Sequence, residues 1–203
     1  MENADARLDG LFAEYEGLSG RRYRKVEGYR AQDAEYLLVL LGSSFETAKE
    51  AVDRLRSQNV RAGALTLQML RPFPAKELWE ICRHAKCVLV GDRQDSYGAG
   101  GGNLSLEVRA ALQRFGFSGK IRARVYGLGG TDFFVEDALE LFALCRQEHA
   151  EDFGYYGVVK EERETCVKRE TAAERSGSRV AREDAAGAHC GPDGKGTGAS
   201  LSA

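Results

Sequence analysis

Three glycine-rich segments of this sequence contain the residue types that hold phosphate groups or nucleotides in other proteins. Gly42-Ser43-Ser44 precedes a helical pattern, where free backbone N–H groups and the helix dipole attract anions. It lacks the lysine and the glycine spacing of a P-loop. Gly98-Ala99-Gly100-Gly101-Gly102-Asn103 departs from the dinucleotide pattern G-x-G-x-x-G, because Asn103 occupies the last glycine position. Gly127-Leu128-Gly129-Gly130-Thr131-Asp132 is expected to form left-handed turns and to cap a helix through Asp132. All three segments are therefore expected to serve turns and close backbone packing.

The residues that act as nucleophiles, bases and metal ligands form no recognisable constellation. The five cysteines are irregularly spaced, and the closest pair, Cys82 and Cys87, is wider than the C-x2-C spacing of zinc or iron–sulfur sites. His84 and His149 fall near predicted helix ends, away from any nucleophile in a loop. The sequence thus predicts no catalytic, cofactor-binding or metal-ligating residue in this chain.

Length, charge and hydropathy set further limits on function. The chain has 203 residues and a net charge of −2, which does not favour nucleic acid or an anionic membrane as a generic partner. No apolar run approaches the ~20 residues of a membrane span, and the polar start Met1-Glu2-Asn3-Ala4-Asp5 lacks the regions of a signal peptide. A soluble, cytoplasmic protein is expected.

Apolar runs and helical patterns alternate between residues 36 and 150. The continuous apolar run at residues 36–41 is typical of a strand that is buried on both faces. A helix follows, with Ser44 in the N-cap position and one apolar side formed by Phe45, Ala48, Val52 and Leu55. Pro74 suits the first turn of the next helix. Further strands are predicted at residues 60–67, 87–90 and 121–126, with an additional edge strand at residues 26–30.

This alternation predicts the fold class. Successive strand–helix units are joined by right-handed crossovers, which place the strands in a parallel sheet with helices on both faces. We therefore predict an α/β fold with a doubly wound, mostly parallel, Rossmann-like sheet of four to five strands. Residues 1–30 form a linker helix and edge strand, residues 31–159 form the domain, and the polar residues 160–203 form a disordered tail.

Six motifs occur in an order that resembles one family. They are the segment at residues 11–23, Val26-Glu27-Gly28-Tyr29-Arg30, Gly42-Ser43-Ser44, Leu70-Arg71-Pro72-Phe73-Pro74, Asp92-Arg93 and Tyr126-Gly127-Leu128-Gly129-Gly130. In this order, over roughly residues 8–159, the sequence resembles the C-terminal half of the α chain of pyruvate:ferredoxin oxidoreductase (pyruvate synthase). The resemblance implies a transketolase C-terminal-like domain with an antiparallel edge strand.

The resemblance also implies an activity for the full complex. That family decarboxylates pyruvate oxidatively to acetyl-CoA and reduces ferredoxin, using thiamine diphosphate, Mg²⁺ and iron–sulfur clusters. It implies as partners a pyrimidine-binding domain, a thiamine-binding β chain and a ferredoxin-like chain. The pyrimidine-binding domain and the cysteine sets of the clusters are absent from this sequence, so a non-catalytic structural or assembly role is expected for the chain.

The expected contacts with partners lie at the ends of the strands. The charges of Asp92, Arg93 and Asp95 follow a predicted strand, where an interface ion pair is favoured over acid–base chemistry. The residues predicted to form the interface are Arg71, Phe73, Asp92, Arg93, Gly98, Gly100, Gly101 and Gly102. Two alternatives stay open, an independent protein- or small-ligand-binding module and a fragment of a transketolase or 2-oxoacid dehydrogenase β chain. The 2-oxoacid is not readable from this region.

Overall fold

The structure, a computed structural model, describes residues 2–158. In this part of the chain the strands are β1 (Val26–Tyr29), β2 (Tyr36–Val39), β3 (Ala62–Leu67), β4 (Cys87–Asp92), β5 (Lys120–Val125) and β6 (Phe153–Tyr155). The helices are α1 (Glu2–Ser19), α2 (Ser43–Ser57), α3 (Ala75–Cys82), α4 (Asn103–Arg114) and α5 (Val135–Arg146), with a short 3-10 turn η1 (Leu128–Gly130). Strands and helices therefore alternate from β2 to β6.

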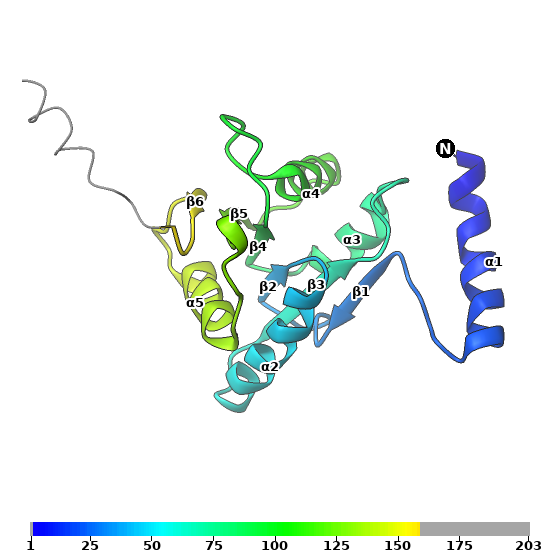
Figure 1. Ribbon diagram of the computed structural model, residues 1–203, viewed down its shortest axis with the longest axis horizontal. Helices are drawn as coiled ribbons and strands as arrows, with labels where there is room; N and C mark the ends of the chain where they lie inside the picture. The colour runs from blue at the N-terminus through cyan, green and yellow to red at the C-terminus, as the bar shows by residue number, and fades with distance from the viewer. Residues whose placement is uncertain (1, 159–203) are drawn as a thin grey trace, which may run out of the picture. The chain divides into compact units, whose positions relative to one another are not determined.

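The six strands of the described residues form one sheet in the order β1-β3-β2-β4-β5-β6 (Figure 1). β1 pairs antiparallel with β3, and all other neighbours are parallel. From β2 the chain adds β3 on one side and then crosses to add β4, β5 and β6 on the other. The direction of winding therefore reverses between β2 and β4, and the carboxyl ends of β2 to β6 share one edge of the sheet.

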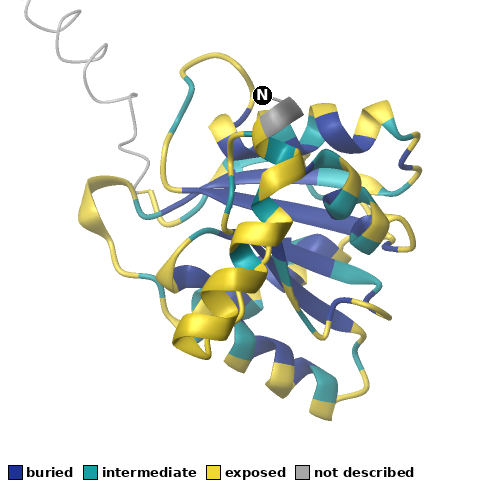
Figure 2. Cartoon of the chain, turned by 90° about the vertical axis from the view of Figure 1, so that its right-hand side faces the viewer, coloured by how far each residue is buried: buried dark blue, intermediate teal, exposed yellow. Residues whose placement is uncertain are grey.

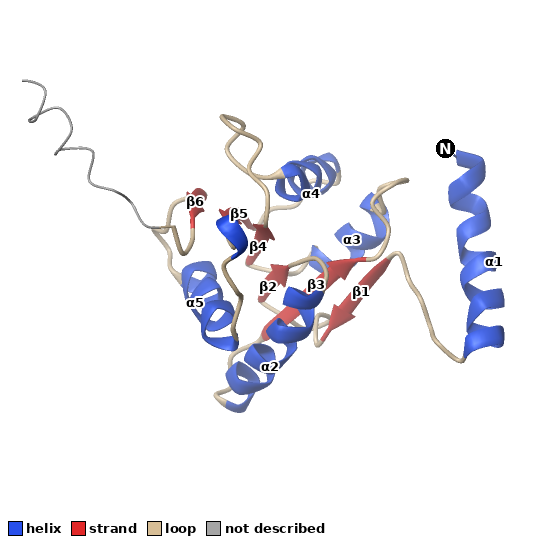
Figure 3. Ribbon diagram, viewed as in Figure 1, coloured by secondary structure: helices blue, strands red, loops and turns tan. Residues whose placement is uncertain are grey.

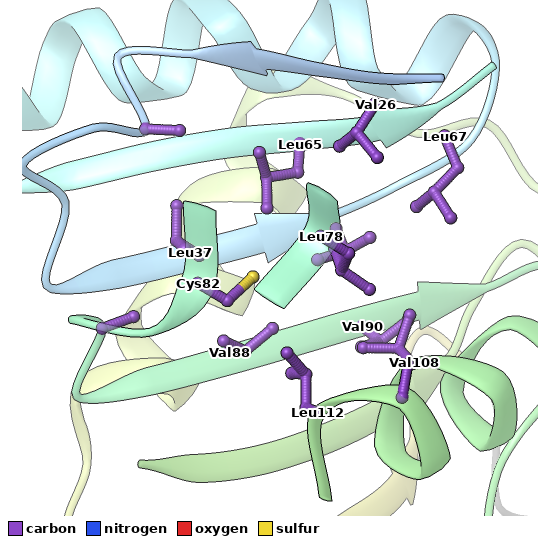
Figure 4. Packing of buried hydrophobic residues seen from close by; sticks show 14 of the residues in the cluster. Val26, Leu37, Leu65, Leu67, Leu78, Cys82, Val88, Val90, Val108 and Leu112 are labelled. Atoms are coloured by element: carbon purple, nitrogen blue, oxygen red, sulfur yellow. The ribbon is translucent and has the colours of Figure 1, made fainter. Parts of the chain in front are cut away.

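Helices cover both faces of the sheet, with α2 and α5 on one face and α3 and α4 on the other (Figure 1). All residues of β3 and β4 are buried, as the dark blue strands at the centre of the sheet show (Figure 2), which explains why these strands are mainly apolar. On one face, Leu78 and Cys82 of α3 pack with Val108 and Leu112 of α4 over the sheet (Figure 4). Phe45, Ala48, Val52 and Leu55 form the buried side of α2 on the other face.

The predicted α/β doubly wound sheet and its antiparallel edge strand are confirmed, while several local predictions are wrong. The sheet has a sixth strand, β6, whose three residues are too few to form a recognisable pattern. Pro74 lies one residue before the start of α3. The predicted tail at residues 160–203 lies outside the described residues.

Both predicted helix caps are also wrong. Ser44 is buried inside the first turn of α2, and the residue in the N-cap position is Gly42, whose φ of 63° favours glycine. Asp132 is exposed and lies before the start of α5. That helix begins after Phe134, whose backbone N–H donates to the Asp137 carboxylate at 2.6 Å. The cap of α5 therefore comes from its own first turn.

Two buried arginines on β5 attach the segment that leads to β6. The Arg122 side chain is 1% exposed, and its guanidinium donates to the carbonyls of Leu144, Gln147 and Glu148. Arg124, two residues later on the same face of the strand, donates to the Glu151 carbonyl at 2.8 Å. These bonds satisfy carbonyls at and beyond the C-terminus of α5, which lack helical partners.

Ion pairs to one lysine connect α1 to α3. The Lys25 ammonium, on a side chain that is 6% exposed, lies 2.8 Å from Asp5 and 3.5 Å from Asp9, both on α1. On its other side it lies 3.3 Å from Glu77 of α3. The hydrogen bond that the Lys25 ammonium donates to Asp5 is the main cause that raises the pKa of Lys25 above its ordinary value, and burial opposes it. The lysine therefore stays charged and joins carboxylates of two elements.

We expect Lys25→Met to loosen α1 while the sheet stays folded. The change removes the ammonium group, so the carboxylates of Asp5 and Glu77 lose their ion-pair partner. Loss of an ion pair with a buried member lowers stability more than loss of an exposed pair. Hydrogen exchange should become about tenfold faster in α1, with little change in β2 to β5. Lys76→Met, at an exposed lysine of α3, is the control. Unchanged exchange in α1 of Lys25→Met would show that other contacts hold this helix.

Candidate functional site

A pocket of about 550 Å³ opens at the carboxyl edge of the sheet, where the winding reverses between β2 and β4. In open α/β sheets, ligands bind in the crevice at this switch point. The residues that line the pocket are Leu41, Leu70, Arg71, Gly91, Asp92, Arg93, Gln94, Asn103, Leu104, Glu107 and Tyr126. They come from the ends of β2 to β5 and from the first two turns of α4. Three of the predicted site residues, Arg71, Asp92 and Arg93, are therefore brought together.

Asp92 ends β4 and is buried, and it caps α4. One carboxylate oxygen accepts the Leu104 backbone N–H at 2.9 Å and the other accepts the Ser105 N–H at 3.0 Å. Close approach of the loop makes this possible, because a Cβ at Gly102 would lie 2.3 Å from the Asp92 Cβ. A negative charge at a helix N-terminus also interacts favourably with the helix dipole. Both oxygens thus bind the chain's own backbone.

Arg93 is exposed at the rim of the pocket but is held in place. Its guanidinium donates to the Thr131 carbonyl at 2.8 Å and lies 5.8 Å from the centroid of the Tyr126 ring. Gly127 has a left-handed φ of 64°, and a Cβ there would come within 2.7 Å of the Arg93 Nε. Among residues 2–158, Arg93 has no carboxylate partner. It is therefore a positioned guanidinium with N–H donors to spare.

Arg71 and Tyr126 complete the walls. The Arg71 guanidinium lies 2.5 Å from a carboxylate oxygen of Glu107 on α4 and donates to the Leu70 carbonyl at 2.6 Å. Its charge is therefore paired within the domain. The Tyr126 side chain is buried at the end of β5, and burial raises the pKa of its hydroxyl. Its ring provides apolar surface at neutral pH.

Of the other predicted site residues, Gly102 packs against Asp92 at the pocket, and the rest lie away from it. Phe73 is half-buried and packs against the core on the α3 and α4 face. Gly98 and Gly100 have left-handed φ values of 87° and 68° in open surroundings, while Gly101 is buried against Ser105. The β4–α4 connection that carries these glycines projects from the sheet (Figure 3) and presents Tyr97, which is 90% exposed. Gly98 and Gly100 therefore lie in a projecting loop, whereas Gly101 and Gly102 are buried where this loop joins α4.

Exposed large apolar side chains gather at the carboxyl edge of the sheet. Leu70 follows β3, Tyr97 follows β4, Leu128 and Phe134 lie between β5 and α5, and Tyr155 is the last residue of β6. In the described residues, none of the loops at the opposite edge carries an exposed large apolar side chain. Groups of exposed apolar side chains often mark interaction surfaces, whereas single exposed apolar residues are common on any protein. We call these five residues the carboxyl-edge patch.

The described residues do not fit an iron–sulfur cluster, which needs four cysteine ligands in one place. Cys82 lies in the core on one face of the sheet, and Cys87 and Cys145 lie on the other. Burial raises the pKa of Cys82 to about 12, and the adjacent Cys87 together with burial raises the pKa of Cys145. Residues 2–158 also contain no group of three or more histidine, cysteine or acidic side chains placed to hold a metal ion.

The sequence pointed to the charged rim of the pocket but not to its apolar floor. Leu41, Leu104 and Tyr126 read as ordinary strand and helix residues. Their positions at the ends of β2 and β5 and at the start of α4 could have identified them, because these ends meet at one edge of a parallel sheet.

No helix of the described residues is both long and apolar enough to cross a membrane.

Comparisons with known proteins are consistent with one another. The model of the family "Pyruvate:ferredoxin oxidoreductase core domain II" matches residues 34–138. The PorA subunit of pyruvate synthase from Thermotoga maritima is 39% identical over 142 residues, which cover 70% of this chain and 36% of that subunit. The PorA subunit from Pyrococcus abyssi is 33% identical over 147 residues, 72% of this chain and 37% of the relative.

A relative with another substrate in its name is equally similar. The VorA subunit of ketoisovalerate oxidoreductase from Pyrococcus horikoshii is 36% identical over 137 residues, covering 67% of this chain and 34% of that subunit. A solved 2-oxoglutarate:ferredoxin oxidoreductase from Magnetococcus marinus has a TM-score of 0.47 at 20% identity, over 63% of this chain and 20% of that one. This chain thus spans about a third of the length of these curated relatives. As the motif order indicated, the chain belongs to the pyruvate:ferredoxin oxidoreductase core domain II family, the transketolase C-terminal-like domain of 2-oxoacid:ferredoxin oxidoreductase α chains.

Proposed function

We propose that this chain is a non-catalytic structural and assembly domain of a 2-oxoacid:ferredoxin oxidoreductase of the pyruvate synthase type. The full complex would oxidatively decarboxylate pyruvate to acetyl-CoA and reduce ferredoxin. The observation that carries the proposal is the match to core domain II across residues 34–138. The strand ends of this domain present the carboxyl-edge patch, which suits a surface that contacts other chains.

The cofactors of such a complex would be bound by its other parts. In this proposal thiamine diphosphate and Mg²⁺ are held by a pyrimidine-binding domain and a thiamine-binding β chain, and iron–sulfur clusters by a ferredoxin-like chain. The positions of Cys82 on one face of the sheet and of Cys87 and Cys145 on the other support this division. The assembly would work in the cytoplasm, and residues 31–159 would act as its structural unit.

The interface would use the predicted residues in different ways. Arg93 and the loop that carries Gly98 and Gly100 are exposed and free to contact a partner. Arg71 would contribute beside its partner Glu107. Asp92 would act indirectly, since its carboxylate holds the start of α4 in place.

The pocket favours a second candidate, an independent module that binds a small ligand or a protein. A concave site at the switch point is the default location for a ligand in this fold class. A neighbouring reading frame for a thiamine-type pyrimidine domain would favour the assembly role. Its absence would favour the independent module.

We expect the double variant Arg93→Ala and Tyr97→Ala to weaken assembly with the cognate chains at least tenfold. Arginine and tyrosine are frequent energetic anchors of interfaces, and both side chains are exposed at the carboxyl edge. The measurement is the dissociation constant with the purified partner chains. Arg71→Ala is expected to have a smaller effect because of its ion pair with Glu107.

Arg114→Ala is the matched control for this experiment. Arg114 is also exposed and also lies over an aromatic ring, with its guanidinium 5.7 Å from the centroid of Phe115, but at the far end of α4. The Arg114→Ala variant should therefore have the same dissociation constant as the natural chain. If Arg71→Ala, Arg93→Ala and the double variant all assemble like the natural chain, these residues do not form the interface.

A further inference from the structure

In the pocket between the ends of β2 and β4, most side-chain acceptors already have partners, whereas several donors do not. Both oxygens of Asp92 are occupied by backbone N–H groups of α4. Glu107 is paired with Arg71, and the Asn103 side-chain oxygen accepts the Ser96 hydroxyl at 2.8 Å. Asp92, Asn103 and one oxygen of Glu107 are therefore engaged by the domain itself.

The donors, in contrast, remain available. A guanidinium has five N–H groups, and the hydrogen bond to the Thr131 carbonyl uses one of those of Arg93. The Asn103 amide keeps its NH2 group once its oxygen is bonded to Ser96. A ligand that complements this rim must supply acceptors, and an anionic group is the strongest acceptor for a guanidinium.

The interior of the pocket is apolar. Leu41, Leu104 and the ring of Tyr126 line it, and burial keeps the last two out of water. Gly91 lets Leu40 and the Tyr126 ring pack closely against the end of β4, because a Cβ there would lie 2.5 Å from Leu40 Cδ2 and 3.0 Å from Tyr126 Cε1. The volume of about 550 Å³ falls within the range of small-molecule sites.

We propose that this pocket binds a small organic anion, with its carboxylate or phosphate at Arg93 and its apolar body against Leu41, Leu104 and Tyr126. This site goes beyond the assembly role, and it is present in the chain by itself. Arg93 is prepared for the task, because Tyr126, Gly127 and Thr131 already fix its guanidinium. A fixed arginine loses less freedom on binding than a mobile one.

The test uses the full chain and three probes that share one apolar body. They are 4-methylpentanoate, 3-methylbutyl phosphate and the neutral 4-methylpentanamide. Binding of each probe is measured by two-dimensional NMR of the ¹⁵N-labelled protein. At least one anion should shift the resonances of Arg93, Leu104 and Tyr126 saturably, with a Kd on the order of 1 mM for a fragment of this size. The amide should bind at least tenfold more weakly. The anion that binds tighter identifies the headgroup.

Two variants separate the site from general effects. Arg93→Gln should weaken the bound anion at least tenfold, whereas Arg114→Gln, at the matched arginine over Phe115, should not. Leu70→Trp, which adds a ring at a half-exposed position on the wall, should abolish binding by filling the pocket. The proposal is overturned if neither anion gives saturable shifts, if the amide binds as well, or if Arg93→Gln binds like the natural chain. Because no partner chain is present, failure of the assembly role would not affect this result.

Discussion

Replacing Asp92 by alanine is expected to lower the free energy of unfolding by about 2–3 kcal/mol. The backbone N–H groups of Leu104 and Ser105, which donate to Asp92, are buried. A buried N–H group without a partner lowers the free energy of unfolding by about 1–3 kcal/mol. Loss of the capping charge at α4 adds to this. Urea denaturation followed by circular dichroism gives the change, and hydrogen exchange at Leu104 and Ser105 shows whether it originates there.

Two further variants test the explanation. Asp92→Asn keeps one acceptor and is expected to lose about half as much stability, because its NH2 group cannot accept the second N–H. Asp132→Ala removes an exposed carboxylate that lies before α5, and it should change stability by less than about 0.5 kcal/mol. Equal stability of Asp92→Ala and the natural chain would mean that α4 finds other partners for its first N–H groups.

Replacing Arg122 by methionine is expected to cost about 3 kcal/mol or more. Methionine fills similar volume, but the guanidinium hydrogen bonds to the Leu144, Gln147 and Glu148 carbonyls are lost, and bonds to charged donors contribute about 1.5–3 kcal/mol each. Removing the buried Nε, which has no partner among the described residues, offsets part of this loss. We therefore expect a destabilisation smaller than the sum of the bonds, measured by urea denaturation.

Exchange and a surface control complete this experiment. The amides of α5 near Leu144 and the segment 147–155 should lose protection first, because Arg122 and Arg124 attach them to β5. Arg146→Met, at an exposed arginine of the last turn of α5, should be nearly neutral. Buried ionic groups can sometimes be replaced by apolar ones without loss. An Arg122→Met protein as stable as the natural chain would place this arginine in that class.

The sequence was sufficient to predict the sheet and its main strands, because buried parallel strands are continuous apolar runs. β4 and β3 are buried along their whole length, and no other element type explains such short runs between turns. β5 was also predicted as a strand, but its sequence does not indicate that its arginines are buried. Its alternation of arginine with apolar residues is typical of a half-exposed strand, yet Arg122 and Arg124 are buried because carbonyls beyond α5 require donors.

Helix caps and the site depended on contacts between residues distant in sequence. Local rules placed caps at Ser44 and Asp132, whereas α4 is capped by Asp92, which lies on the preceding strand beyond the loop. The same geometry brought Arg71, Asp92 and Arg93 to one pocket, as expected for residues at strand ends. Arg71 forms an ion pair, Asp92 caps α4, and Arg93 keeps free N–H donors. These separate roles depend on tertiary packing, which a short sequence motif does not reveal.

The central proposal, that this chain is a working part of a 2-oxoacid:ferredoxin oxidoreductase, is tested most directly by isolating it from its native host. Proteins that co-purify with the chain are identified by mass spectrometry, and pyruvate-dependent reduction of viologen is measured in the same fraction. We predict thiamine-binding and iron–sulfur chains in stoichiometric amounts, together with activity that the chain alone lacks. A solitary, inactive protein would contradict the proposal and leave an independent binding module.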